Sequence, residues 1–128
     1  MRYLTRDEIV DKNIELLQDF GGFIGGVDNL LNPGQLDYLC EAVRDDRLCV
    51  SLTEKAAFYA HRIITGHTFN DGNKRTGLAC ALLFLVMNGI SYSVTNDEIE
   101  RTALGVEDKT ISREKLSALI GEWISRQS

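Results

Sequence analysis

The sequence contains few of the residues that hold small proteins together covalently or through metals. Its 128 residues include three cysteines, two histidines and a single proline. Cys40, Cys49 and Cys80 are odd in number, and no two of them have Cys-x-x-Cys spacing. This pattern argues against a disulfide framework or a zinc site and favours buried free thiols in a reducing compartment. We therefore expect a cytoplasmic protein that folds on its hydrophobic core without covalent or metal support.

Long apolar runs and an excess of positive charge are also missing. The longest apolar run, Leu78 to Met87, has ten residues, whereas a membrane-spanning helix needs about 20. Charged residues such as Arg2 and Arg6 interrupt the N-terminal segment, so no secretory signal is expected there. The net charge of −5 argues against binding to nucleic acid or to an anionic membrane, because both repel an acidic surface. A local phosphate site made by a few cations stays compatible with this charge.

Strand signals are few, and helix signals dominate. No internal repeat, low-complexity tract or linker divides residues 1–128, so we expect a single domain. Capping boxes mark three helix starts, at Thr5 with Glu8, Ser51 with Glu54, and Thr95 with Glu98. Asn32 followed by Pro33 indicates a further N-cap. The predicted helices span 6–19, 33–44, 52–65, 73–88, 96–104 and 113–125. The only extended pieces expected are a short one over 90–94 and a hairpin or loop over 21–26.

The helix predicted after Asn73 differs from the others because it is apolar on every face. Such a helix is expected at the centre of its domain. Asn88 and Gly89 supply a left-handed stop. The last helix instead carries one apolar stripe, from Leu116 to Ile124, in which Trp123 is expected to pack in the core.

The chain concentrates its chemistry in the polar segment that leads into this central helix. A buried helix start leaves backbone amides unpaired, and these amides and the helix dipole favour an anion such as phosphate. Lys74 and Arg75 add charge, and Arg75 can grip two phosphate oxygens through its planar guanidinium. Asp71 would repel that phosphate unless a hard cation such as Mg²⁺ lay between them. His67 can accept a proton from an attacking hydroxyl.

Three neighbouring residues complete this segment. Gly72 lets the backbone approach a ligand closely. Asn73 either caps the helix or points its amide at a phosphate, and Phe69 is interpreted as a hydrophobic anchor that fixes the loop. Each residue taken alone also suits an ordinary turn or a solvated surface. Together they predict an enzyme that transfers a phosphate-containing group from a nucleotide.

The ten residues from His67 to Thr76, HTFNDGNKRT, resemble the signature of the Fic/Doc superfamily, H-x-F-x-[D/E]-G-N-[G/K]-R, at all its fixed positions. Their ending, from Asn73 to Thr76, is similar to the Doc (death-on-curing) branch. Further similarity covers 21–24 with 30–43, and 111–124. Most of the chain therefore takes part in the resemblance, although only the central motif is diagnostic.

The resemblance implies an all-α fold. This is a compact Fic-type helical domain with a buried central helix after the motif loop and at most a short β-hairpin or flap. It implies His67 as the base toward a protein hydroxyl and Asp71 as a Mg²⁺ ligand. It also implies phosphate or nucleotide contacts from Gly72, Asn73, Lys74 and Arg75. Family members carry a flap that holds the target backbone, and here it would include Gly22, Phe23 and Ile24.

In the Doc branch the γ-phosphate of ATP goes to a threonine of translation elongation factor Tu, and translation stops. The resemblance therefore implies a kinase-like toxin with ATP as substrate and a Thr or Ser hydroxyl as acceptor. The family's inhibitory pattern, [S/T]-x-x-x-E-[G/N], is not intact, because Lys115 follows the correctly spaced Thr110 and Glu114. We infer inhibition by a separate small antitoxin.

Two departures bear on which group is transferred. Adenylylating Fic enzymes usually carry glycine where this chain has Lys74, and a second arginine where it has Leu78. Both differences weaken the case for AMP transfer, which stays the main alternative. Conversely, Doc has alanine where this chain has Gly72, so the site mixes features of the two branches.

Two further alternatives stay open from the residues alone. One is a metal-dependent phosphohydrolase that uses His61, His67 and Asp71, although the motif lacks a second carboxylate. The other is a non-enzymatic interaction module with a degenerate site, against which the complete motif argues.

Overall fold

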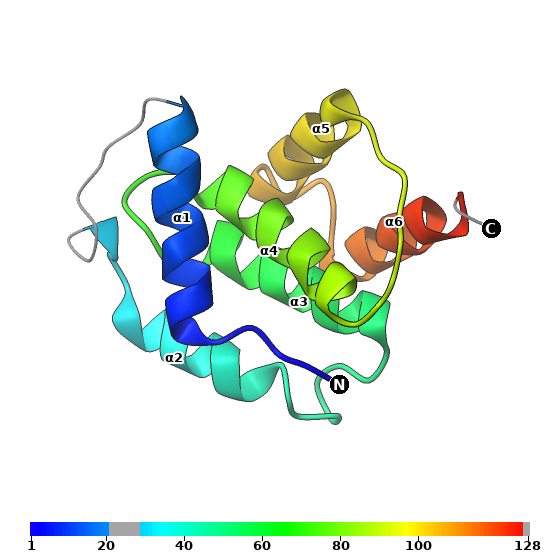
Figure 1. Cartoon of the computed structure of the whole chain (residues 1–128), viewed down its shortest axis with the longest axis horizontal. Helices are drawn as coiled ribbons and strands as arrows, with labels where there is room; N and C mark the ends of the chain where they lie inside the picture. Colours follow the sequence, from blue (N-terminus) through cyan, green and yellow to red (C-terminus); the bar gives the residue numbers. More distant parts are fainter. Residues whose placement is uncertain (21–28, 127–128) are drawn as a thin grey trace.

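A computed structural model describes residues 1–20 and 29–126 of the chain. It contains the helices α1 (Arg6–Phe20), α2 (Pro33–Ala42), α3 (Leu52–Thr65), α4 (Asn73–Met87), α5 (Asn96–Glu107) and α6 (Arg113–Ser125) (Figure 1). Strands are absent from these described residues, where one isolated antiparallel bridge joins Leu30 and Phe69. The all-α prediction is therefore confirmed. The expected hairpin or loop over 21–26 lies outside the described residues.

The segment over 90–94 is not a strand, because no extended neighbour among residues 1–20 and 29–126 pairs with it. It connects α4 to α5 instead, and its Ser93 amide donates to the Trp123 carbonyl of α6 at 2.9 Å. Trp123 itself is buried in the core, as predicted.

Local capping explains most helix starts. The Thr5 amide donates to Glu8 Oε1 at 2.9 Å, and the Glu8 amide donates back to Thr5 Oγ1 at 3.2 Å. Reciprocal capping boxes also open α3 and α5, as predicted from Ser51 and Thr95. Asn32 stands at the N-cap of α2 and Pro33 follows it at the start of the helix, as predicted, although the Asn32 side chain makes no cap hydrogen bond.

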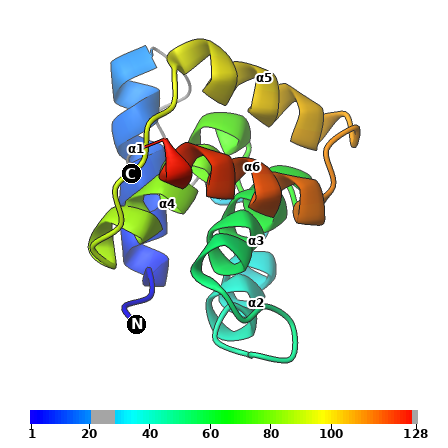
Figure 2. The ribbon, with the colours of Figure 1, turned by 90° about the vertical axis from the view of Figure 1, so that its right-hand side faces the viewer.

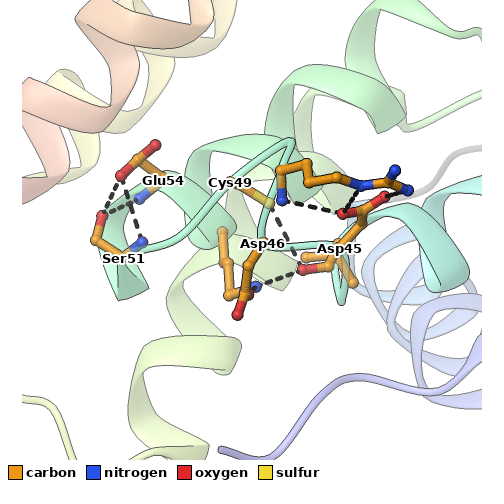
Figure 3. Close-up of polar contacts among 8 residues, drawn as sticks. Asp45, Asp46, Cys49, Ser51 and Glu54 are labelled. Carbon is orange, nitrogen blue, oxygen red and sulfur yellow. Dashed lines mark hydrogen bonds and ion pairs between the residues drawn. The ribbon is translucent and has the colours of Figure 1, made fainter.

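Two helix ends differ from the predicted ones because distant residues decide them. α2 ends at Ala42 rather than near residue 44, and the buried Lys55 of α3 donates from Nζ to the Val43 carbonyl at 2.7 Å. Figure 3 shows Asp45 and Asp46 in the turn that follows α2. Lys55 also holds Asp46 at 3.0 Å, which fixes the turn between α2 and α3. α5 continues to Glu107 rather than residue 104, because Val106 is fully buried against the core.

The centre of the protein is the pair α3 and α4, which run side by side in opposite directions (Figure 1). Gly77 permits their close approach, since a Cβ there would lie 2.7 Å from Ile64 Cγ1 and 3.0 Å from the Ala60 carbonyl. α4 is buried over most of its length, as predicted, although Val86 in its last turn is exposed. Its predicted left-handed stop is confirmed, because Gly89 has φ 77° and Ile90 donates to the Leu85 carbonyl at 3.0 Å.

The other helices surround this pair (Figures 1 and 2). α1 packs on α4, α2 and α6 pack on α3, and α5 contacts both central helices. The turn between α3 and α4, which carries the polar motif, therefore lies at one end of the core. Within the described part of the chain, no helix has both the length and the apolar character needed to cross a bilayer.

Candidate active site

The motif loop spans the turn from the end of α3 to the start of α4. His67 is exposed and lies in the left-handed region at φ 48°, a backbone conformation that costs energy in a residue with a Cβ. Asn32 stabilises this turn, because its Nδ2 donates to the His67 carbonyl at 2.8 Å and to the Gly66 carbonyl at 3.2 Å. The side chain expected to cap α2 thus satisfies carbonyls at the C-terminal end of α3.

The segment over 29–32 supports the loop from behind. The amides of Leu31 and Asn32 both donate to the Thr68 carbonyl, at 2.9 and 3.1 Å. The Asn70 amide donates to the Asn29 carbonyl at 2.8 Å. Phe69 lies between these contacts and is 1% exposed, as expected of a hydrophobic anchor. These bonds fix the backbone from His67 to Asn70 against the core.

A buried asparagine pair ties the next residue, Asp71, to helix α1. Asn13 Nδ2 donates to the Asp71 carbonyl at 3.1 Å and to Thr76 Oγ1 at 3.0 Å. Asn29 Nδ2 donates to the Asn13 side-chain oxygen and, at 3.3 Å, to the same Asp71 carbonyl. Asn13 and Asn29 are 1% and 0% exposed. Two elements outside the motif therefore set the position of Asp71.

Gly72 and Asn73 also have structural roles within the protein. Gly72 has φ 82°, and a Cβ there would lie 3.1 Å from Asn13 Nδ2 and 3.2 Å from Leu17 Cδ2. The close approach that requires glycine is therefore to α1. Asn73 is the first residue of α4 and does not cap it, since Gly72 stands at the N-cap. The Asn73 side chain instead accepts from the Phe69 amide at 2.9 Å and donates to the Phe69 carbonyl at 2.7 Å.

A cleft of about 450 Å³ opens in front of this loop, and the expected motif residues line it together. They are His67, Asn70, Asp71, Gly72, Asn73, Lys74 and Arg75, joined by Glu107 from the end of α5. Lys74 Nζ lies 3.3 Å from Glu107 Oε1, and both side chains are about half exposed. The cleft thus combines an imidazole, two cations, two carboxylates and the N-terminus of a buried helix. Such a combination suits a phosphate-bearing ligand with a hard cation.

Other candidate residues lie elsewhere. His61 belongs to a separate cavity beside Arg113, and burial together with the Arg113 and Arg62 charges lowers the pKa of its imidazole. Leu78 is fully buried, so it is remote from any phosphate. Gly22, Phe23 and Ile24 lie outside the described residues. No group of three or more His, Cys, Asp or Glu side chains in the described ranges is placed to hold a metal.

Sequence reasoning missed Asn13, Asn29 and Glu107. One signal was present, since Asn13 occupies the apolar face of α1 between Ile9 and Leu17, at the four-residue spacing of buried positions. Asparagine is unfavourable inside a helix, so its presence on that face indicates a specific hydrogen-bonding role. Glu107 gave no comparable signal, because it resembles any exposed acidic residue at a helix end.

Comparison with known proteins agrees with the resemblance of the motif. A model described as the Fic/DOC family matches residues 3–85, which is more than half of the chain. The chain belongs to the Fic/Doc family. It is also 33% identical over 93 residues to the protein named "Protein kinase doc" of Escherichia phage P1, covering 70% of this chain and 71% of that relative.

These matches support the Doc branch within the Fic/Doc superfamily, as the motif ending indicated. The family match contains helices α1 to α3, the whole motif loop and all but the last two residues of α4. It also contains Asn13 and Asn29. Glu107 lies beyond the matched range, so its place in the cleft comes from the structure of this chain alone.

Proposed function

We propose that this Fic/Doc protein transfers the γ-phosphate of ATP to a serine or threonine hydroxyl of a protein target. By analogy with the Doc branch, the target is translation elongation factor Tu, and the consequence is a block of translation in the cytoplasm. The relative from phage P1 is named a protein kinase, which supports this assignment. The protein would then act as a toxin that a small antitoxin neutralises.

The observation that carries the proposal is the pair Lys74 and Leu78. Lys74 places an ammonium group in the cleft where adenylylating relatives have glycine. Leu78 is fully buried in the core where those relatives have a second arginine. The cleft therefore lacks the second guanidinium that would hold the outer phosphates during AMP transfer, and Lys74 occupies part of that space. Both differences favour γ-phosphate transfer over AMP transfer.

Each cleft residue has a chemical role in this proposal. His67 would accept the proton of the acceptor hydroxyl, and its exposure lets a protein substrate reach it. Lys74 and Arg75 would balance the charge of the transferred phosphate, together with the backbone amides around Gly72 and Asn73. Because the Asn73 side chain binds Phe69, Asn73 would contribute through its backbone.

The cleft also fits Mg²⁺. This ion is usually bound by one or two protein carboxylates with water and substrate phosphates, rather than by a full cage of side chains. Asp71 supplies an exposed carboxylate in the cleft, and the Asn13 and Asn29 contacts hold its backbone. Bound there, Mg²⁺ would neutralise phosphate charge.

The phosphohydrolase alternative is not favoured. His61 lines a different cavity from His67 and Asp71, so the three side chains do not form one site. A hydrolase would also release phosphate from ATP without a protein acceptor, which a malachite-green assay would detect.

The antitoxin needs a surface beside the cleft, and an apolar groove offers one. The groove has a volume of about 500 Å³ and lies between α1, α4 and α5, with Ala79, Leu83 and Val86 on its floor. Arg75 lines both the groove and the cleft, so a helix bound in the groove would affect the phosphate site. Leu83→Glu should abolish neutralisation in co-expression while keeping toxicity, whereas the exposed Gln18→Glu on α1 serves as a control.

The decisive experiment follows which phosphate moves. The purified protein is incubated with elongation factor Tu, Mg²⁺ and ATP labelled at either the α- or the γ-phosphate. We expect label from the γ-position only, and an intact-mass increase equal to one phosphate. An AMP adduct would overturn the kinase proposal and support AMP transfer by the same residues.

A further inference from the structure

A second cavity, remote from the motif loop, has the chemistry of a binding site. It has a volume of about 340 Å³, is open to solvent and is lined by residues of α2, α3, the start of α6 and the loop before α3. Its lining is Tyr38, Leu48, Phe58, His61, Arg62, Ser112, Arg113 and Glu114. It shares none of these residues with the catalytic cleft. Neither the motif nor the proposed reaction explains it.

Positive charge dominates this cavity although the chain as a whole carries −5. The lining carries two guanidinium groups, those of Arg62 and Arg113, and a single carboxylate, that of Glu114. The charges of the two guanidinium groups act on the His61 imidazole inside the cavity, because they add to burial in lowering its pKa. Among the described residues, neither arginine forms an ion pair within 4.0 Å.

Aromatic rings hold the two guanidinium groups in place. Arg62 lies over the Tyr38 ring at 5.0 Å from its centroid, and Arg113 lies over Phe58 at 5.2 Å. Arg62 Nη2 donates to Gln35 Oε1 at 2.6 Å, while its Nε is buried without a partner in the described part of the chain. A stacked arginine keeps most of its five N–H donors for a planar acceptor such as a carboxylate. An acceptor bound here would also offset the cost of the unpaired donor.

The rim of the cavity favours a protein ligand over a small anion. Tyr38 and Leu48 are 48% and 39% exposed, and Val50 in the same loop is 61% exposed. Exposed tyrosine and aliphatic side chains around arginines are typical of protein–protein contacts. An acidic segment that also carries an apolar side chain would match both the charge and the rim.

The position of the cavity relative to His67 suggests which protein would bind there. Arg62 lies in the last turn of α3, which ends at Thr65, and His67 follows the end of that helix by two residues. The Arg62 carbonyl accepts the Gly66 amide at 2.9 Å, and Gln35 lies beside Gly66. A protein whose hydroxyl reaches His67 would therefore extend over this cavity.

We infer that the cavity between α2, α3 and α6 is a docking site for an acidic, partly apolar segment of the protein substrate. Arg62 and Arg113 bind the carboxylates, and Tyr38 with Leu48 contacts the apolar side chain. The inference rests on the proposed modification of a protein, since that reaction supplies the partner. It predicts that substrate affinity and chemistry depend on separate residues.

The first test measures binding without catalysis. A fluorescein-labelled peptide EELEE is titrated with the full chain by fluorescence anisotropy at low salt, beside the neutral peptide QQLQQ. We expect EELEE to bind, QQLQQ to bind at least tenfold more weakly, and Arg113→Gln to weaken EELEE binding at least tenfold. The Arg113 side chain donates no hydrogen bond to the described part of the chain, so Arg113→Gln breaks none there. Circular dichroism checks that the variant keeps its fold. Arg101→Gln, an exposed arginine of α5 outside both cavities, should bind like the parent chain.

Three binding results would overturn the inference: no binding of EELEE, equal binding of both peptides, or an Arg113→Gln variant that binds as the parent does.

The second test uses phosphate transfer to elongation factor Tu. Arg113→Gln should raise KM for the protein substrate at least fivefold and leave KM for ATP and kcat within twofold. If the parent is active and Arg113→Gln has the same KM for the protein substrate as the parent, the docking site is refuted and the kinase proposal stays intact. A parent without any transferase activity would refute the kinase proposal, while the peptide titration would still report on the cavity.

Discussion

Replacing Asn13 by leucine tests whether the buried asparagine pair holds the motif loop. Leucine has a similar size and suits the apolar face that Ile9 and Leu17 already form on α1. The substitution removes the donors to the Asp71 carbonyl and to Thr76 Oγ1, and the acceptor for Asn29. Local helix propensity would improve, so any loss of stability must come from these tertiary contacts.

The expected destabilisation follows from counting these groups. Each of the three lost hydrogen bonds is worth about 1 kcal/mol, and leaving the buried Asn29 amide poorly paired adds about 1–3 kcal/mol. Burial of the leucine side chain returns about 1–2 kcal/mol. We therefore expect a net loss of about 2–5 kcal/mol in the free energy of unfolding. A gain in stability would show that the asparagine network is unfavourable for folding.

Urea unfolding followed by circular dichroism measures this change. With an m-value of about 2 kcal/mol per molar urea, the midpoint should fall by about 1–2.5 M at constant m. Gln18→Leu is the matched control, because Gln18 is exposed on the same helix and should change stability by less than about 0.5 kcal/mol. An Asn13→Leu midpoint within 0.3 M of the parent, roughly the resolution of the method, would refute the reasoning. Transferase activity of the folded variant should fall as well, because Asp71 loses part of its support.

Further substitutions examine the chemistry and the packing. His67→Ala should lower the rate of transfer by about 10²–10⁴-fold in a folded protein, and a rate within threefold of the parent would remove His67 as the base. Asp71→Asn should shift the Mg²⁺ dependence of activity to higher concentration, and an unchanged Mg²⁺ titration would count against its role as a ligand. Gly77→Ala should cost about 1–3 kcal/mol, because its Cβ would meet Ile64 and the Ala60 carbonyl. Gly121→Ala is the control and should raise the thermal midpoint slightly, because nothing lies within 4 Å of the added Cβ. Equal effects of Gly77→Ala and Gly121→Ala on stability would contradict the packing argument. Burial raises the pKa of the Cys80 thiol to about 12, so little of it is thiolate at pH 8. Iodoacetamide should therefore label the half-buried Cys40 before Cys80, and labelling of Cys80 first in mass spectrometry would contradict this expectation.

Helix starts were predictable from the sequence because their signals are local. A hydroxyl and a carboxylate three residues apart satisfy each other's amides, whatever the rest of the chain does. Helix ends were less predictable where a distant side chain intervenes. Lys55 captures the Val43 carbonyl and shortens α2, and burial of Val106 lengthens α5. Asn32 illustrates the same competition, since its amide binds the Gly66 and His67 carbonyls rather than capping its own helix.

The sequence by itself determined the family and the motif residues of the cleft, because the motif from His67 to Arg75 is continuous and its residue types imply their chemistry. Only the tertiary structure decided what supports and borders that motif. Asn13, Asn29 and Glu107 come from other parts of the chain, and His61 lies in a different cavity from His67 although six residues separate them. The reason is geometric. A loop that joins two packed helices brings neighbouring residues into one cleft, whereas contacts between helices depend on how their apolar faces pack.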